Sequence, residues 1–182
     1  MLAGAAVADP YPFEGFFALE RPGEPHAGCG FDILHQTHSG AFSGYLLDRR
    51  HWETYKTPRF LRYKHGTCTF DGKTGIDACV TETNHIAAIQ DAKPDRAKIT
   101  VIDDDAVAML TLGEGDDDAE ALAGVPPFVF RRCPFAAEAI APLLTDGVAG
   151  YTTEELREMA RTPDTRRTRA VLDAIAGSAA VD

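Results

Sequence analysis

The stretch RFLRYKHGTCTFDGKTGIDACVT, residues 59–81, is the part of this chain that most clearly predicts its fold. Residues 59–70 are rich in aromatic and β-branched side chains, which favour a strand. In residues 76–81, apolar and more polar side chains alternate with the period of two that is typical of a half-buried strand. The turn-forming Asp71-Gly72-Lys73 lies between them. The stretch therefore predicts two strands joined by a turn.

The same pattern continues on both sides of this unit, so we expect a series of short strands. Turn-like separators such as Lys93-Pro94-Asp95 and Asp103-Asp104-Asp105 divide them, and no long helical segment crosses between them. This spacing predicts an antiparallel β-rich meander, either a sheet or a partly closed barrel. Besides the two strands above, the expected strands are residues 13–20, 41–48, 85–90, 98–102, 106–112 and 128–131.

Helical patterns are confined to the C-terminal third. Residues 135–144 have helical apolar spacing, with Pro142 requiring a kink or an early end. Thr152 and Glu155 form a capping-box pattern for a helix that ends before Pro163. A last helix carries an apolar face and has Gly177 as its expected C′ residue. We therefore expect an α+β fold with two or three C-terminal helices, divided into a β-rich body (1–125, with a Pro/Gly-rich N-terminal segment) and a helical subdomain (126–182) packed on it.

Composition limits the classes of function. The 182 residues carry 18 basic and 28 acidic side chains, a net charge of −10, which disfavours general binding to nucleic acid or to anionic membranes. No run approaches the ~18 apolar residues of a membrane span. Residues 1–10 lack the basic start of a signal peptide, so we expect a soluble cytoplasmic protein with reduced cysteines. If the chain were exported, Cys68 and Cys79 would be the first pair to test for a disulfide.

Potential metal ligands gather in residues 26–38. Imidazole and thiolate are ligands that zinc and iron accept, so zinc or iron is the expected cofactor if this cluster is real. Cys29 could alternatively be a thiolate nucleophile with a histidine as its base. The competing interpretation is a set of unrelated surface and core residues. The candidate ligands are His26, Cys29, His35 and His38, with His65 and His85 on separate predicted strands completing a site inside a barrel.

A second candidate site combines basic and aromatic residues and could receive an acidic partner or an anionic ligand. The alternative is a row of half-buried strand edges with solvated side-chain stems. Residues 113–124 are expected to be an acidic loop, and they lack the ligand spacing of a calcium site. The members of the basic-aromatic set are Arg49, Arg50, Trp52, Tyr55, Arg59, Arg62, Tyr63 and Lys64.

No complete catalytic constellation can be assembled from these residues. We therefore expect a non-catalytic binding or accessory protein that recognises a peptide, a protein partner or a small ligand through the sheet and the basic-aromatic set. The alternative is a small metal-dependent enzyme that uses the His/Cys cluster.

Overall fold

The structure, a computed structural model, describes residues 13–20, 28–70, 75–85, 96–112, 126–162 and 165–179. The strands are β1 (Gly15–Leu19), β2 (Asp32–Gln36), β3 (Ala41–Leu47), β4 (Phe60–Phe70), β5 (Gly75–Asn84), β6 (Arg96–Asp103), β7 (Ala106–Leu112), β8 (Phe128–Arg132) and β9 (Leu144–Thr145). The helices are α1 (Arg49–Tyr55), α3 (Ala137–Ile140), α4 (Thr153–Arg161) and α5 (Thr165–Ala179), with short 3₁₀ turns η1 (Gly28–Gly30) and η3 (Ala141–Leu143).

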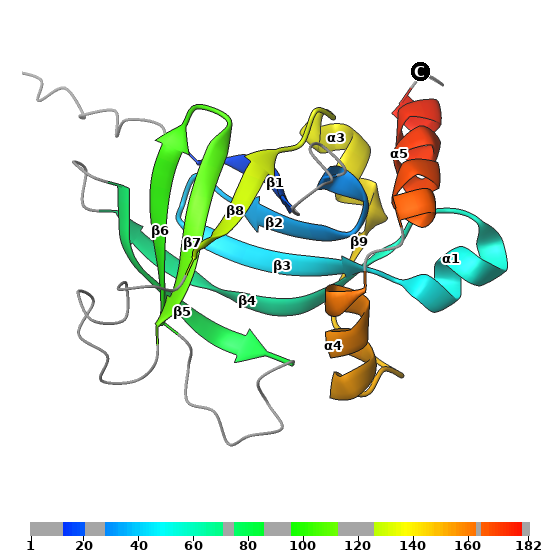
Figure 1. The fold of residues 1–182 in the computed structure, drawn as a ribbon, viewed down its shortest axis with the longest axis horizontal. Coiled ribbons are helices and arrows are strands. Elements are labelled where there is room, and N and C mark those ends of the chain that lie inside the picture. The colour runs from blue at the N-terminus through cyan, green and yellow to red at the C-terminus, as the bar shows by residue number, and fades with distance from the viewer. Residues whose placement is uncertain are drawn as a thin grey trace, which may run out of the picture.

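Strands β1 to β8 form a closed antiparallel barrel. Each strand pairs with its neighbour in the chain, and β8 pairs back with β1, so that the meander joins its own beginning (Figure 1). Short β9 adds to β4 in parallel. The α+β meander expected from the sequence is thus confirmed, in its barrel form. β8 lies beyond the expected boundary at residue 125 and completes the barrel, and closure pairs the edges that an open sheet would expose.

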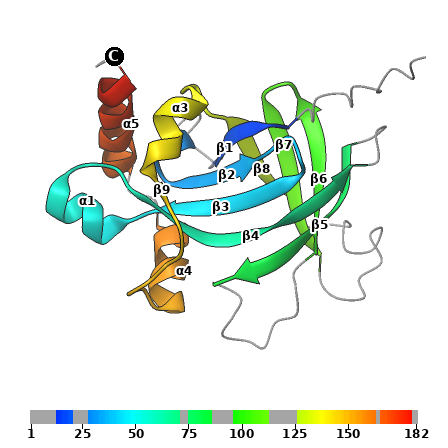
Figure 2. The same cartoon turned by 180° about the vertical axis from the view of Figure 1, so that it is seen from behind.

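The barrel has apolar side chains on both faces of β1 and β2. Phe17 and Leu34 point inward and pack with the interior cluster, whereas Phe16 and Ile33 belong to a second cluster on the outside. Helices α3 and α5 cover that outer cluster on one side of the barrel (Figures 1 and 2). Because both faces of β2 are buried, its sequence lacks the alternation by which a half-exposed strand is recognised.

Two elements differ from the sequence-based expectation. β2 was not expected, and it runs through the presumed metal-binding segment. α1 was not expected either. It contains Arg49, Arg50, Trp52 and Tyr55 of the basic-aromatic set, for which strand edges were the alternative interpretation. Asp48 caps α1 by accepting a hydrogen bond from the His51 backbone N–H at 3.0 Å, and Lys56 ends it in the left-handed conformation. Most of the strand expected at 85–90 lies outside the described residues.

The C-terminal helices follow their capping signals in one case and not in the other. Thr152 Oγ1 accepts from the Glu155 N–H at 3.2 Å, and Glu155 accepts from the Thr152 N–H at 2.7 Å, so the capping box of α4 is confirmed. The expected end at Gly177 is wrong, because α5 continues to Ala179. A Cβ added at Gly177 would have no neighbour within 4 Å, so nothing at that position requires the helix to stop.

All four cysteines are paired, which corrects the expectation of reduced thiols. Cys29 of η1 joins Cys133, the residue after β8, across 104 positions of sequence. Cys68 and Cys79, the pair singled out for an exported chain, lie directly opposite each other on β4 and β5 and form the second disulfide. Among the described residues, no helix is long and apolar enough to cross a membrane.

The Cys29–Cys133 disulfide ties the start of β2 to the end of β8 and so restricts the unfolded chain more than a short link would. We predict that the Cys29→Ser/Cys133→Ser double variant loses about 3–5 kcal/mol of unfolding free energy. Urea denaturation followed by the fluorescence of Trp52, the chain's one tryptophan, measures this. An unchanged unfolding free energy would contradict a role for this link in holding the barrel closed.

Candidate functional site

The expected metal cluster does not form. Cys29 is consumed by its disulfide with Cys133, so it supplies neither a metal ligand nor a nucleophilic thiolate. His26 lies outside the described residues. Within the parts of the chain that the structure describes, no three His, Cys, Asp or Glu side chains come together in a way that could hold a metal ion. The expectation of zinc or iron is therefore wrong.

The remaining histidines are kept apart by the strands that carry them. His35 lies on the outer face of β2, where its ring stacks on Phe16 with 4.3 Å between centroids. His38 is exposed in the turn between β2 and β3. His65 Nε2 lies 3.3 Å from a Glu82 carboxylate oxygen, and His85 follows the end of β5, where its carbonyl accepts from Thr153 Oγ1 at 2.9 Å.

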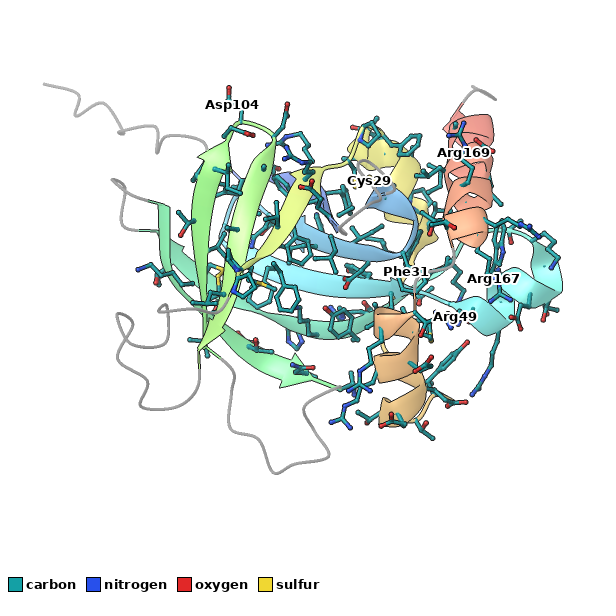
Figure 3. All side chains as sticks on the ribbon, viewed as in Figure 1. Cys29, Phe31, Arg49, Asp104, Arg167 and Arg169 are labelled. Carbon is teal, nitrogen blue, oxygen red and sulfur yellow. A yellow bond between two sulfur atoms is a disulfide. The ribbon has the colours of Figure 1, made fainter. Side chains whose placement is uncertain are left out.

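The first arginines of the basic-aromatic set hold α4 on the barrel. Arg49 donates to the carbonyl of Met159 at 3.3 Å and to that of Thr162, and its guanidinium lies 5.3 Å from the Phe31 ring centroid. Figure 3 shows Arg49 and Phe31 close to α4. Arg50 donates to Gly150 O at 2.6 Å and pairs with Glu155. These arginines thus bind the chain's own C-terminal part.

The other members of the set point in several directions. Arg59 lies 3.3 Å from the buried Asp48 carboxylate, and Arg62 lies 3.2 Å from that of Asp146. Trp52 is buried in the outer cluster, whereas Tyr55 is 66% exposed. The set is therefore not one continuous surface, and its part in binding a partner stays a prediction.

Tyr63 and Lys64 line the inside of the barrel because of a β-bulge. Gly44 of β3 pairs with Lys64, and the next residue, Tyr45, pairs with Arg62, which leaves Tyr63 as the extra residue on β4. Glycine at position 44 leaves room for both side chains at this bulge: an added Cβ would lie 2.7 Å from Lys64 Cε and 2.9 Å from Tyr63 Cε1, so these side chains would have to shift. The bulge thus directs two consecutive side chains into one space.

That space is a cavity of about 350 Å³ at the end of the barrel next to α4. Its walls come from strands on different sides of the barrel and from the last turn of α4. One part of the lining is apolar and aromatic, and the other carries charged and hydroxyl groups. The lining residues are Leu19, Asp32, Tyr63, Lys64, Met109, Phe128, Phe130, Ala160 and Arg161.

The polar side of the cavity is strongly desolvated. Asp32 is 8% exposed and Tyr63 is 7% exposed. Burial, together with the nearby negative charge of Asp32, raises the pKa of the Tyr63 hydroxyl well above its usual value of 10. The phenol therefore stays protonated and able to donate at neutral pH. The Lys64 ammonium lies 5.2 Å from the Tyr63 ring centroid, within the range of a cation–π interaction.

The lining combines a buried carboxylate, an amine and a phenol with an apolar wall. Among the described residues that line it there is no histidine, cysteine or serine to act as a nucleophile or general base near neutral pH. It does offer an apolar wall and several convergent polar groups, which is the composition of a small-molecule site. The basic-aromatic pattern predicts Tyr63 and Lys64 as site residues, and the sequence gives no signal for Asp32.

A buried carboxylate next to α1 holds the segment that leads into α4. Asp48 accepts from the Tyr151 hydroxyl as well as from His51 N–H, and burial together with this hydrogen bond raises the pKa of Tyr151 to about 12. Arg50 also lies over the Tyr151 ring, with 4.1 Å between its Cζ and the ring centroid. Asp48 and Arg50 together therefore fix the start of the helix that borders the cavity.

We predict that Tyr151→Phe lowers the unfolding free energy by about 1–3 kcal/mol, because the variant leaves a buried carboxylate short of a donor. The exposed Tyr55→Phe is the matched control and should leave stability unchanged. The difference between the wild type and Tyr151→Phe should be fully present below pH 10 and disappear as pH rises through about 12. Equal stability of the two variants in urea would contradict this role of Asp48.

His35 should make the protein sensitive to mild acid. Its pKa is lowered from 6.5 by burial against Phe16, and Glu14 opposes the shift only in part. The unfolded chain then binds the proton more readily than the folded one, so the unfolding free energy falls as pH drops below about 6.5 towards the folded pKa. We predict a flatter pH profile for His35→Phe across this window, with the exposed His38→Phe as control. A wild-type profile in His35→Phe would show that another group causes any acid sensitivity.

Comparison with family models, with curated proteins and with solved structures returns no match for this chain. The function of the cavity must therefore be argued from its own geometry and chemistry, without support from a relative.

Proposed function

We propose that the protein is a non-catalytic binding protein that takes up one small, mostly apolar molecule in the cavity next to α4. The observation that carries this proposal is the convergence of Asp32, Tyr63 and Lys64 on a cavity of about 350 Å³ whose other lining residues, apart from Arg161 at its rim, are apolar. Ligand sites commonly have this form, an apolar container in which a few fixed polar groups set the orientation of the ligand. Its volume lies at the small end of the range for such sites.

The apolar wall of the cavity reaches the protein surface, where a ligand could enter. Phe128 lines the cavity and is also 55% exposed, so its ring belongs both to the lining and to the surface. Phe130 and Met109 continue the apolar wall inward and belong to the interior cluster of the barrel. A ligand bound against the ring of Phe128 would remove that apolar surface from water, and this burial favours binding.

Closure of the barrel argues against the peptide ligand that the sequence also allowed. An extended peptide commonly binds by adding a strand to a free sheet edge. Among the described strands, β1 to β8 each pair on both sides within the ring. The net charge of −10 likewise supports a small molecule over a nucleic acid as the partner.

The disulfides bear on where the protein works. Disulfides of this kind persist in oxidising compartments and are rare in the reducing cytoplasm. Both pairs lie in the packed clusters of the fold, Cys29–Cys133 in the outer cluster and Cys68–Cys79 inside the barrel. We therefore propose an oxidising compartment in place of the cytoplasm.

The proposal is tested by titrating the protein with the neutral fluorophore N-phenyl-1-naphthylamine, whose emission rises in an apolar site. We expect saturable binding at one site per chain. Ala160→Phe, which places a ring in the cavity from α4, should weaken this binding roughly tenfold or more, because the volume it fills is lost to the probe.

The matched control is Ala137→Phe, which adds the same ring at an exposed position on α3. Trp52 fluorescence verifies that both variants are folded, since overpacking at Ala160 costs about 1–3 kcal/mol of stability. Absence of saturable binding to the wild type, or equal binding to Ala160→Phe, would contradict the proposal.

A further inference from the structure

We infer that the ligand of the cavity is a small apolar monocarboxylate, whose carboxylate is held by the Lys64 ammonium and the Tyr63 hydroxyl while its apolar part lies against Phe128, Phe130 and Met109. This inference rests on the proposed binding function and specifies the chemistry of the ligand.

The polar groups of the lining consist mostly of donors. Lys64 and Arg161 are positively charged, Tyr63 has a hydroxyl that can donate, and Asp32 is the one acidic group among the lining residues. The lining thus has two positive side chains and one negative, although the Arg161 guanidinium also lies 3.9 Å from the Glu154 carboxylate and the whole chain carries a net charge of −10. A positive site in an acidic protein attracts an anion more strongly than an amine or a neutral molecule.

The positions of the charges also favour an anion. Asp32 is buried, whereas Lys64 is only half-buried and its ammonium lies over the Tyr63 ring within the lined space. Arg161 is exposed at the end of α4, where it can attract an anion towards the mouth of the cavity.

Asp32 lies near the Tyr63 hydroxyl and affects its pKa. Its negative charge, added to burial, raises the pKa of the Tyr63 hydroxyl above the usual value of 10, at which the hydroxyl is already protonated at neutral pH. Tyr63 and the adjacent Lys64, brought to the same side of β4 by the bulge, can then donate to the two oxygens of one carboxylate. Hydrogen bonds to a charged group in a desolvated site are the strong ones, so they should decide which ligands bind.

The test compares three ligands with the same eight-carbon chain. Octanoate, octylamine and octanol each displace N-phenyl-1-naphthylamine from the wild type, from Lys64→Met and from Lys64→Arg. We expect octanoate to bind at least about tenfold more tightly than the other two. Lys64→Met should weaken octanoate binding about 10- to 100-fold and leave octanol unchanged, whereas Lys64→Arg retains the preference.

Lys98→Met is the matched control, because Lys98 lies on β6 and is not a lining residue of the cavity. Tightest binding of octylamine would overturn the inference and assign recognition to Asp32. An equal loss for all three ligands in Lys64→Met would overturn it as well, since Lys64 would then only shape the cavity. If the fluorophore itself does not bind to the wild type, the proposed function fails and not merely this choice of ligand.

Discussion

Pairing of β8 with β1 is the constraint on which the rest of this structure depends. It joins strands more than a hundred residues apart, at Phe17–Arg132 and Leu19–Phe130, and converts a meander into a barrel. The Cys29–Cys133 disulfide fixes the same closure covalently at the edge of the outer cluster. Once the barrel is closed, its interior must be filled or must hold a ligand. Among the described residues, the interior cluster fills part of it, and the cavity next to α4 is a part that is not filled.

Local patterns predicted most of the fold and little of the site. The alternation in β5, the aromatic content of β4 and the Thr152–Glu155 capping box were all readable because they depend on neighbours in sequence. β2 was missed because both of its faces are buried, and closure could not be derived because it depends on a pairing between distant strands. The Cys29–Cys133 pair depends on closure too, whereas Cys68 and Cys79 lie on the neighbouring strands β4 and β5 and could be singled out from the sequence.

In the candidate site, a single β-bulge changes which side chains share a face of the strand. Tyr63 and Lys64 belong to the basic-aromatic set of the sequence, but a regular strand would place these two neighbours on opposite faces. The extra residue opposite Gly44 and Tyr45 brings both into the cavity, and a period-two pattern gives no signal for it. The predicted histidine cluster fails because the fold separates residues that are close in sequence. β2 places His35 on the outer face and the next turn carries His38 away from it.

The most direct test of the account is a methyl NMR spectrum of protein labelled at its three methionines, recorded with and without N-phenyl-1-naphthylamine. Met109 lines the cavity, so its methyl signal should shift in proportion to the bound fraction and show contacts with the ring protons of the probe. Such contacts would place the ligand inside the barrel. A Met109 signal that stays unchanged at saturating probe would show that binding occurs elsewhere, and would contradict the claim that the cavity next to α4 is the functional site.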